Sequence, residues 1–287
     1  MFSNDKLIYL QLQKTGCSHI AYLLSKYIGG YGQNDELFKH TWLQYYGGSR
    51  FILGSIRNPW DWYVSLWAYG CKKKGAIYFC TVYRFVMFLF IFVTKFQNII
   101  GLKGPGRNYN EIFTHFKNEF NKPIKEWAAV YKNIKDPECF RRWLKLIFNQ
   151  DRKLDIRGGY SECSISNFAG LLTFRYCRMY QKHFFRKKNY KGIKNVKELK
   201  EFDKENNIID IIIKNENLEE DLIDAIKKIG YNLDDKTIKS IKNERKTNVS
   251  KHLDSSFYYD EETINLVAEK EKFIIDKYGY KPPKFVK

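Results

Sequence analysis

Residues 13–19, with the sequence Q-K-T-G-C-S-H, combine side chains that bind phosphate, and they lie between an apolar run and a helical stretch. At such a junction, backbone N–H groups and the helix dipole create a site for an anion. Gly16 lets the backbone approach a phosphate closely, Lys14 supplies a positive charge, and the Thr15 and Ser18 hydroxyls can donate to phosphate oxygens. An ordinary N-capped helix is the alternative for this segment when it is taken alone.

A second candidate site lies at residues 56–66, with the sequence I-R-N-P-W-D-W-Y-V-S-L. Arg57 can direct two donors of its guanidinium onto one phosphate. Ser65, about two helical turns further on, offers a hydroxyl from the same side. An arginine that caps a helix beside an aromatic core is the alternative. The occurrence of both segments, each at the end of a strand and the start of a helix, favours phosphate binding.

The elements around these segments predict an α/β fold. Apolar and β-branched runs at 6–12, 50–55 and 207–213 predict strands. Apolar residues at helical spacing predict helices, which follow at 19–27, from 59 onward, at 219–229 and at 260–278. Alternating strands and helices predict a mainly parallel central sheet with helices on both faces. Ligands bind such a sheet at the carboxyl ends of its strands, where both segments lie.

Composition bounds the architecture and the partners. The chain has 287 residues, of which 44% are apolar and 17% aromatic, so one domain with a sizeable core is expected over 1–287. Its formal net charge of +18 favours anionic partners, although a general excess of lysine explains the charge equally well. The six cysteines form no C-x-x-C pair and have no histidine cluster beside them, so free thiols and no bound metal are expected.

Two further features concern location. Residues 1–12 lack a basic segment followed by a long apolar core, so neither a signal peptide nor an anchor is expected, and a cytoplasmic location is predicted. The apolar segment 76–93 approaches the length of a membrane span. Arg84 near its middle would be costly in hydrocarbon, so a buried helix is favoured over contact with a membrane.

The order of residues in the first segment separates two families. A Walker A loop, G-x-x-x-x-G-K-[ST], has its lysine after the glycines, whereas Lys14 precedes the glycine and no Walker string occurs in the chain. Residues 14–18 resemble the 5′-phosphosulfate loop of sulfotransferases that use 3′-phosphoadenosine-5′-phosphosulfate (PAPS), in its K-x-x-C-[ST] form, with His19 in place of the usual Ser or Asn. Residues 57–65 are similar to the 3′-phosphate segment R-[DN]-P-x-D-R-x-x-S, with Trp62 in place of the second arginine.

The likeness continues near the C-terminus. Residues 215–222 resemble the family's E-N-L-x-x-D segment, and residues 248–280 contain strings similar to its N-x-S, Y-Y-[DE] and G-Y ending. In this family the loop before the last helix often touches the 3′-phosphate, which makes Arg245 and Lys246 candidates, with a solvated charge run as the alternative.

The resemblance implies a P-loop-like sulfotransferase fold, nearest to the carbohydrate and bacterial types, that transfers the sulfuryl group of PAPS without a metal. The acceptor would be a hydroxyl or amine on a glycan or small hydroxylated molecule. Residues 1–70 would bind the cofactor, 71–205 would form a helical, basic insertion that binds the acceptor, and 206–287 would complete the core. The implied PAPS-binding residues are Lys14, Thr15, Gly16, Cys17, Ser18, His19, Arg57, Ser65, Arg245 and Lys246.

Sulfuryl transfer needs a charge at the leaving oxygen and a base for the acceptor proton. Lys14 fits the first role. His40 is the preferred base because it lies in K-H-T, between the two segments, as a similar string does in bacterial and carbohydrate sulfotransferases. Carboxylates of 71–205 are the rivals for the role of base.

Two other classes of protein remain as alternatives. A P-loop kinase would share the fold, but it needs the missing Walker lysine. A basic nucleic-acid-binding protein would explain the charge, but no recognisable nucleic-acid-binding motif occurs.

Overall fold

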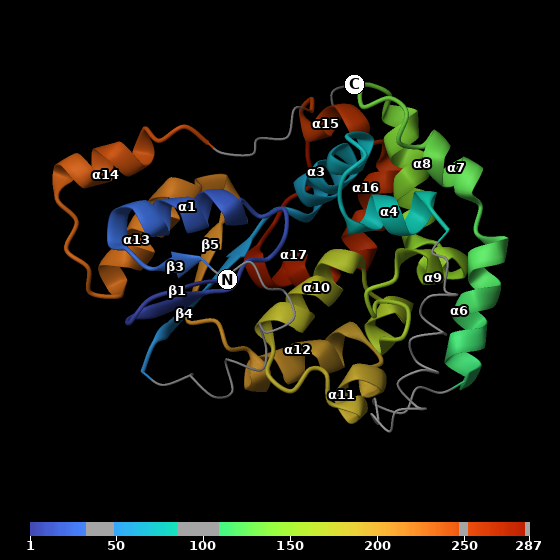
Figure 1. The fold of residues 1–287 in the computed structure, drawn as a ribbon, viewed down its shortest axis with the longest axis horizontal. Coiled ribbons are helices and arrows are strands. Elements are labelled where there is room, and N and C mark those ends of the chain that lie inside the picture. Colours follow the sequence, from blue (N-terminus) through green and yellow to red (C-terminus); the bar gives the residue numbers. More distant parts are fainter. Residues whose placement is uncertain (33–48, 85–108, 247–251, 285–287) are drawn as a thin grey trace, which may run out of the picture.

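The computed structural model describes residues 1–32, 49–84, 109–246 and 252–284. Within these residues, five short strands form one sheet in the order β3-β1-β2-β4-β5 (Figure 1). Strands β2, β4 and β5 run parallel, whereas β1 pairs antiparallel with β2 and with β3. The strands are β1 Phe2–Ser3, β2 Leu7–Tyr9, β3 Tyr31–Gly32, β4 Phe51–Ile56 and β5 Ile211–Lys214. The predicted α/β class is confirmed.

The sheet is mixed, so the prediction of a mainly parallel sheet was wrong. The connection from β1 to β2 spans only residues 4–6, and a parallel pair would require a long crossover. The side chain of Asn4 closes this turn, because its Oδ1 accepts hydrogen bonds from the backbone N–H groups of Lys6 at 3.1 Å and Leu7 at 3.0 Å. Strand β1 has two residues, which is too short to show a sequence period. The finer assignment to a P-loop-like sulfotransferase fold stays a prediction.

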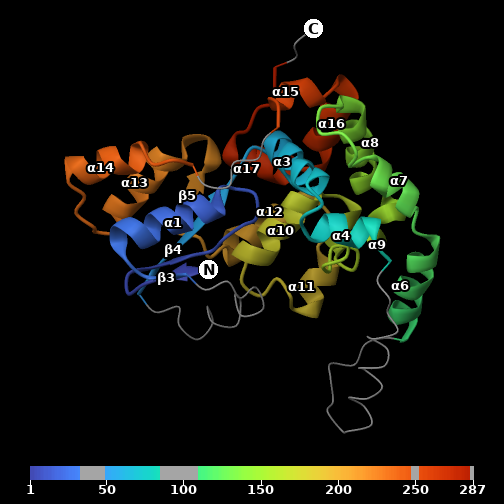
Figure 2. The ribbon, with the colours of Figure 1, turned by 45° about the horizontal axis from the view of Figure 1, so that its top comes forward.

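Helices make up most of the described chain. The longer helices are α1 Cys17–Ile28, α3 Pro59–Cys71, α6 Tyr109–Asn121, α8 Pro137–Phe148, α10 Leu171–Tyr180, α12 Val196–Asn206, α13 Leu218–Lys228, α14 Asp235–Lys242 and α16 Glu261–Lys270. The shorter helices are α4 Ala76–Val82, α7 Ile124–Ala129, α9 Lys153–Ile156, α11 Lys187–Gly192, α15 Ser255–Tyr258 and α17 Lys272–Tyr278, and 3₁₀ turns are η1 Gln150–Arg152, η2 Ser164–Asn167 and η3 Asn215–Asn217. The helices α3 to α12 lie between β4 and β5 in the sequence. Both views place these helices on the opposite side of the sheet from α14 (Figures 1 and 2).

Helices cover both faces of the sheet, as expected. Side chains alternate along a strand, so Leu7 and Tyr9 of β2 pack in one buried cluster with residues of α1 and α13. Ile8, between them, belongs to the other cluster, which includes residues of α3, α10 and α12. Helix α3 begins as its sequence predicts, with Pro59 in its first turn and the Asn58 side chain accepting a hydrogen bond from the backbone N–H of Trp60.

The helix expected over 260–278 is divided into α16 and α17 at Glu271. The backbone of Glu271 has ψ 19°, outside the helical range. Its buried carboxylate accepts hydrogen bonds from the Thr173 hydroxyl at 2.6 Å and from the backbone N–H groups of Thr173 and Leu172 at 2.9 and 3.1 Å. These bonds are made at the start of α10, so the tertiary contact with α10 accounts for the break.

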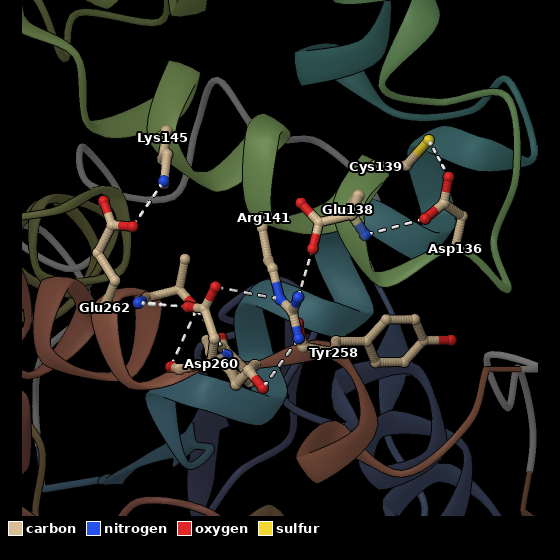
Figure 3. A network of polar contacts seen from close by, with 10 residues as sticks. Asp136, Glu138, Cys139, Arg141, Lys145, Tyr258, Asp260 and Glu262 are labelled. Carbon is tan, nitrogen blue, oxygen red and sulfur yellow. Dashed lines mark hydrogen bonds and ion pairs between the residues drawn. The ribbon is translucent and has the colours of Figure 1, made fainter.

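The segment before α16 is held to α8 by polar contacts (Figure 3). Arg141 donates to the carbonyl of Tyr258 at 3.0 Å and forms an ion pair with Asp260 at 3.4 Å. Lys145, one turn further along α8, pairs with Glu262 at 2.7 Å. The C-terminal helices therefore complete the helical side of the molecule.

Of the apolar segment 76–93, the structure describes the part up to residue 84, where α4 buries Ile77 and Tyr78. The prediction for residues 85–93 lies outside the described residues. Among the residues that are described, none of the helices is long and apolar enough to span a bilayer. All six cysteines are free thiols.

Candidate functional site

The first predicted segment forms the connection from β2 to α1. Gly16 is the N-cap of α1 and adopts the left-handed conformation, with φ +79°. A Cβ at this position would lie 2.6 Å from the Asn215 Nδ2 atom and 2.6 Å from a methyl carbon of Leu218. Both the backbone conformation and the packing of η3 and α13 against the loop therefore require glycine.

The first turn of α1 is suited to an anion. It contains no acidic residue, and no side chain caps it, so no residue of the turn itself offsets the partial positive charge of the helix terminus. Ser18 is exposed in this turn, and Cys17 is half-buried beside it. Twelve residues of helix lie behind the site, enough for a full terminal dipole.

Lys14 is held by an aromatic ring. Its Nζ lies 4.5 Å from the centroid of the Tyr69 ring on α3, at the distance of a cation–π contact. Its backbone has φ 68°, which is rare for a residue with a side chain. Burial, with the positive charges of Arg57 and Lys72 acting in the same direction, lowers the pKa of Lys14 to about 8.

The second segment comes beside the first because β2 and β4 are neighbouring parallel strands, so their carboxyl ends meet at one edge of the sheet. Arg57 follows β4 directly and is half-buried. Burial lowers the pKa of Arg57, while Asp61 and Glu216 oppose that shift. Its Nε is a buried donor with no hydrogen-bond partner among the described residues. Glu216 in turn accepts from the backbone N–H of Asn58 at 2.7 Å.

Two of the predicted hydroxyls face the interior. Thr15 is 0% exposed, and its Oγ1 donates to the Leu12 carbonyl at 2.6 Å and contacts the Ser55 Oγ at 2.6 Å. Ser65 is 2% exposed. Their contact with a phosphate therefore stays a prediction.

His19 and Lys246 meet at one carboxylate. His19 is 3% exposed, and its Nε2 lies 3.7 Å from Glu219 Oε1, while the Nζ of the exposed Lys246 lies 3.6 Å from the same oxygen. Burial lowers the pKa of His19. The structure thus brings Lys246 to the start of α1, whereas Arg245 is exposed and stays a prediction.

The predicted base His40 lies outside the described residues. A different histidine, His252, lies within electrostatic range of the site. Burial lowers its pKa most, and the charges of Arg57 and Lys14 act in the same direction. The His252 Nδ1 lies 2.7 Å from the Leu253 carbonyl oxygen, which fixes the orientation of the ring. His252 lies two residues after the string 248–250 that resembles N-x-S, which is a sequence signal that could have pointed to it.

A cavity of about 570 Å³ opens beside Lys14 and the first turn of α1. The residues of its wall that the motifs did not predict include Arg175, Lys72 and Lys74. Arg175 of α10 lies over the ring of Trp62, with its Cζ 5.4 Å from the ring centroid. Trp62 also donates from Nε1 to the Gln13 carbonyl at 2.8 Å, so this ring joins the loop, α3 and Arg175. Trp62, which replaces the usual arginine of the motif, is the sequence signal that could have pointed to a cation over its ring, here Arg175.

Within the described part of the chain, no group of three or more His, Cys, Asp or Glu side chains could hold a metal ion. Comparison with family models, with curated proteins and with solved structures finds no significant match to this chain.

Proposed function

We propose that this chain is a sulfotransferase that moves the sulfuryl group of PAPS to a hydroxyl or amine of an acceptor. The observation that carries the proposal is that Lys14, in the loop after β2, lies within electrostatic range of Arg57, which directly follows the adjacent parallel strand β4, beside the uncapped start of α1. Two separate cationic sites at one sheet edge fit a nucleotide that carries phosphate on both its 5′ and 3′ sides.

The residues present fit such a donor. The buried Arg57 Nε, without a hydrogen-bond partner among the described residues, is a donor that an anion would satisfy. The K-x-x-C-[ST] order of residues 14–18 favours a phosphosulfate over a nucleoside triphosphate, because a Walker loop has its lysine after the glycines. Lys14, Gly16 and the first turn of α1 would hold the 5′ side, and Arg57 would hold the 3′-phosphate.

The chemistry asks two things of this chain. As the acceptor oxygen bonds to sulfur, the bond from sulfur to the 5′-phosphate oxygen breaks, and negative charge grows on that leaving oxygen. Lys14 would stabilise this charge, and a lysine whose pKa is about 8 is protonated at neutral pH. The acceptor proton would pass to a base, for which His40 remains the proposed residue.

The acceptor would enter through the cavity beside Lys14, since this space opens directly on the residue that would face the leaving oxygen. This cavity of about 570 Å³ would hold the 5′ side of PAPS as well as the acceptor, since Lys14, Gly16 and the first turn of α1 line it too. The part left to the acceptor suits a small hydroxylated molecule or the end of a glycan. The part of the chain between β4 and β5 in the sequence supplies much of the wall of the cavity and would then set the acceptor specificity.

Isothermal titration tests the proposal most directly. Adenosine 3′,5′-bisphosphate, the product of the reaction, should bind more tightly than ATP and more tightly than a single-stranded oligonucleotide. Tighter binding of ATP would favour the kinase alternative, and tighter binding of the oligonucleotide would favour a nucleic-acid-binding protein. Transfer of label from ³⁵S-PAPS to a panel of sugars, phenols and peptides would then identify the acceptor.

A further inference from the structure

The cavity beside Lys14 has a strongly positive wall. Lys14, Lys72, Lys74 and Arg175 line it, and none of the described residues in its lining is an aspartate or a glutamate. Burial is the main cause of the lowered pKa of Lys14, and the charges of Arg57 and Lys72 lower it further, which is the cost of gathering like charges. An anion in this cavity would relieve the repulsion.

The donor accounts for only part of this charge. Under the proposed function, Lys14 and the start of α1 serve the 5′ side of PAPS, and Arg57 serves its 3′-phosphate. Lys72 and Lys74 belong to the connection between α3 and α4, and Arg175 belongs to α10. These three side chains come from the region between β4 and β5, to which the acceptor is assigned.

Arg175 is held in position. Its guanidinium lies over the Trp62 ring at 5.4 Å, and the side chain is half-buried. The start of α10 is tied to the C-terminal helices by Glu271. A planar guanidinium in a fixed orientation can donate two parallel hydrogen bonds to a carboxylate, sulfate or phosphate. The exposed Lys72 and Lys74 add charge without such a constraint.

We infer that Arg175, together with Lys72 and Lys74, forms an acceptor subsite for an anionic group. The acceptor is therefore a hydroxyl or amine compound that already carries a carboxylate, sulfate or phosphate. This inference rests on the proposed function, because it assigns Lys14 to the donor and the remaining cations of the cavity to the acceptor.

The test measures anion binding to protein that has been saturated with adenosine 3′,5′-bisphosphate, so that the donor site is filled. Methyl glucuronide and methyl glucoside, which differ by a carboxylate, are titrated together with inorganic sulfate and inorganic phosphate. The nucleotide-saturated protein should bind methyl glucuronide more tightly than methyl glucoside. Arg175→Gln should weaken binding of the anions about tenfold or more, as expected for the loss of a charge-assisted hydrogen bond. Whichever of methyl glucuronide, sulfate and phosphate binds most tightly indicates whether the acceptor carries a carboxylate, a sulfate or a phosphate.

Matched controls come from neighbouring positions. Lys73 lies between Lys72 and Lys74 in the sequence but does not line the cavity. Arg178 lies one turn after Arg175 on α10 and donates to the Gly158 carbonyl. The double variant Lys72→Ala/Lys74→Ala should weaken anion binding, whereas Lys73→Ala and Arg178→Gln should leave it unchanged. The double variant changes only exposed side chains, so it also serves if Arg175→Gln fails to fold.

The outcomes separate this inference from the proposed function. If adenosine 3′,5′-bisphosphate fails to bind, the proposed function is overturned, and the acceptor inference falls with it. If the nucleotide binds but the saturated protein holds glucuronide no better than glucoside and binds neither sulfate nor phosphate, the acceptor inference alone is overturned. Equal losses in the cavity variants and in their controls would overturn it too, since they would indicate general surface charge.

Discussion

The guanidinium of Arg175 on α10 lies over the ring of Trp62 on α3, with 5.4 Å between its Cζ and the ring centroid. In the motif that residues 57–65 resemble, the position of Trp62 holds an arginine. In this chain, the Trp62 ring at that position packs against the guanidinium of Arg175, which is distant in the sequence. It also bonds to the loop that carries Lys14, because its Nε1 donates to the Gln13 carbonyl.

Replacing Lys14 should affect turnover much more than stability. Under the proposed function, Lys14→Ala would remove a preorganised charge from the leaving oxygen and should lower the rate by about a hundredfold or more. Transfer from labelled PAPS and thermal unfolding are measured on the same preparation. Near-normal turnover in a folded variant would exclude Lys14 from the mechanism.

The pKa of Lys14 also predicts a pH dependence. Because this pKa is lowered to about 8, affinity for adenosine 3′,5′-bisphosphate should fall as the pH rises through that value and Lys14 loses its charge. Lys14→Arg keeps its charge throughout this range, so titrations of this variant should show a weaker decline. The same decline in both proteins would assign it to another group.

Arg57→Ala and Ser65→Ala should weaken the binding of adenosine 3′,5′-bisphosphate much more than that of adenosine 5′-phosphate. Both residues are assigned to the 3′-phosphate, which the second nucleotide lacks. Arg57→Ala should have the larger effect, because Ser65 is only 2% exposed. Arg178→Ala is the control for the loss of a charge. Equal weakening for both nucleotides would contradict the assignment.

Gly16→Ala should destabilise the protein more than Gly279→Ala. Both glycines are left-handed, with φ +79° and +68°, but a Cβ at Gly279 meets nothing within 4 Å, whereas one at Gly16 meets Asn215 and Leu218. The left-handed conformation alone costs an L-residue about 1–2 kcal/mol, so the excess in Gly16→Ala measures the packing conflict. Chemical unfolding measures the free energy of unfolding of both variants. Similar losses of this free energy in the two variants would show that η3 moves aside at little cost.

Glu271 should make stability depend on pH. Burial raises the pKa of Glu271 from 4.5 to about 7, so the folded state binds more protons than the unfolded state between these values. The free energy of unfolding contributed by this group therefore falls as the pH rises through that window and is constant above it. Urea unfolding at several pH values should show a smaller decline in Glu271→Gln than in the wild type.

Glu271→Gln should also be destabilising, by about 1–3 kcal/mol, because an amide N–H₂ would replace one of two oxygens that now accept hydrogen bonds. The exposed Glu269→Gln on α16 is the control and should change stability little. An unchanged pH dependence in Glu271→Gln would mean that this carboxyl does not titrate in the window.

His40→Ala should depress transfer to the acceptor and leave PAPS affinity nearly intact, since a base contacts the acceptor proton and other residues hold the phosphates. The acidic limb of the rate profile should disappear, because a histidine with a pKa near 6.5 must be neutral to accept a proton. His252→Ala is the informative comparison. Loss of the acidic limb in His252→Ala alone would transfer the role of base to His252.

The sequence by itself determined the local parts of this protein. Strands β2, β4 and β5 and the starts of α1 and α3 follow from short-range rules: apolar runs make strands, Gly16 ends a loop, and Asn58 with Pro59 begins a helix. Lys14 and Arg57 could be placed at one sheet edge from the same signals, because each follows a strand.

Only the tertiary structure decided the rest, because it depends on which distant surfaces pack together. The antiparallel strand β1 is too short to show a period, and the break at Glu271 arises from hydrogen bonds to the start of α10. Arg175 comes beside the site because α10 packs near α3, and no short-range pattern encodes that contact. The cations of the cavity are thus brought together by packing, which is set by the whole core.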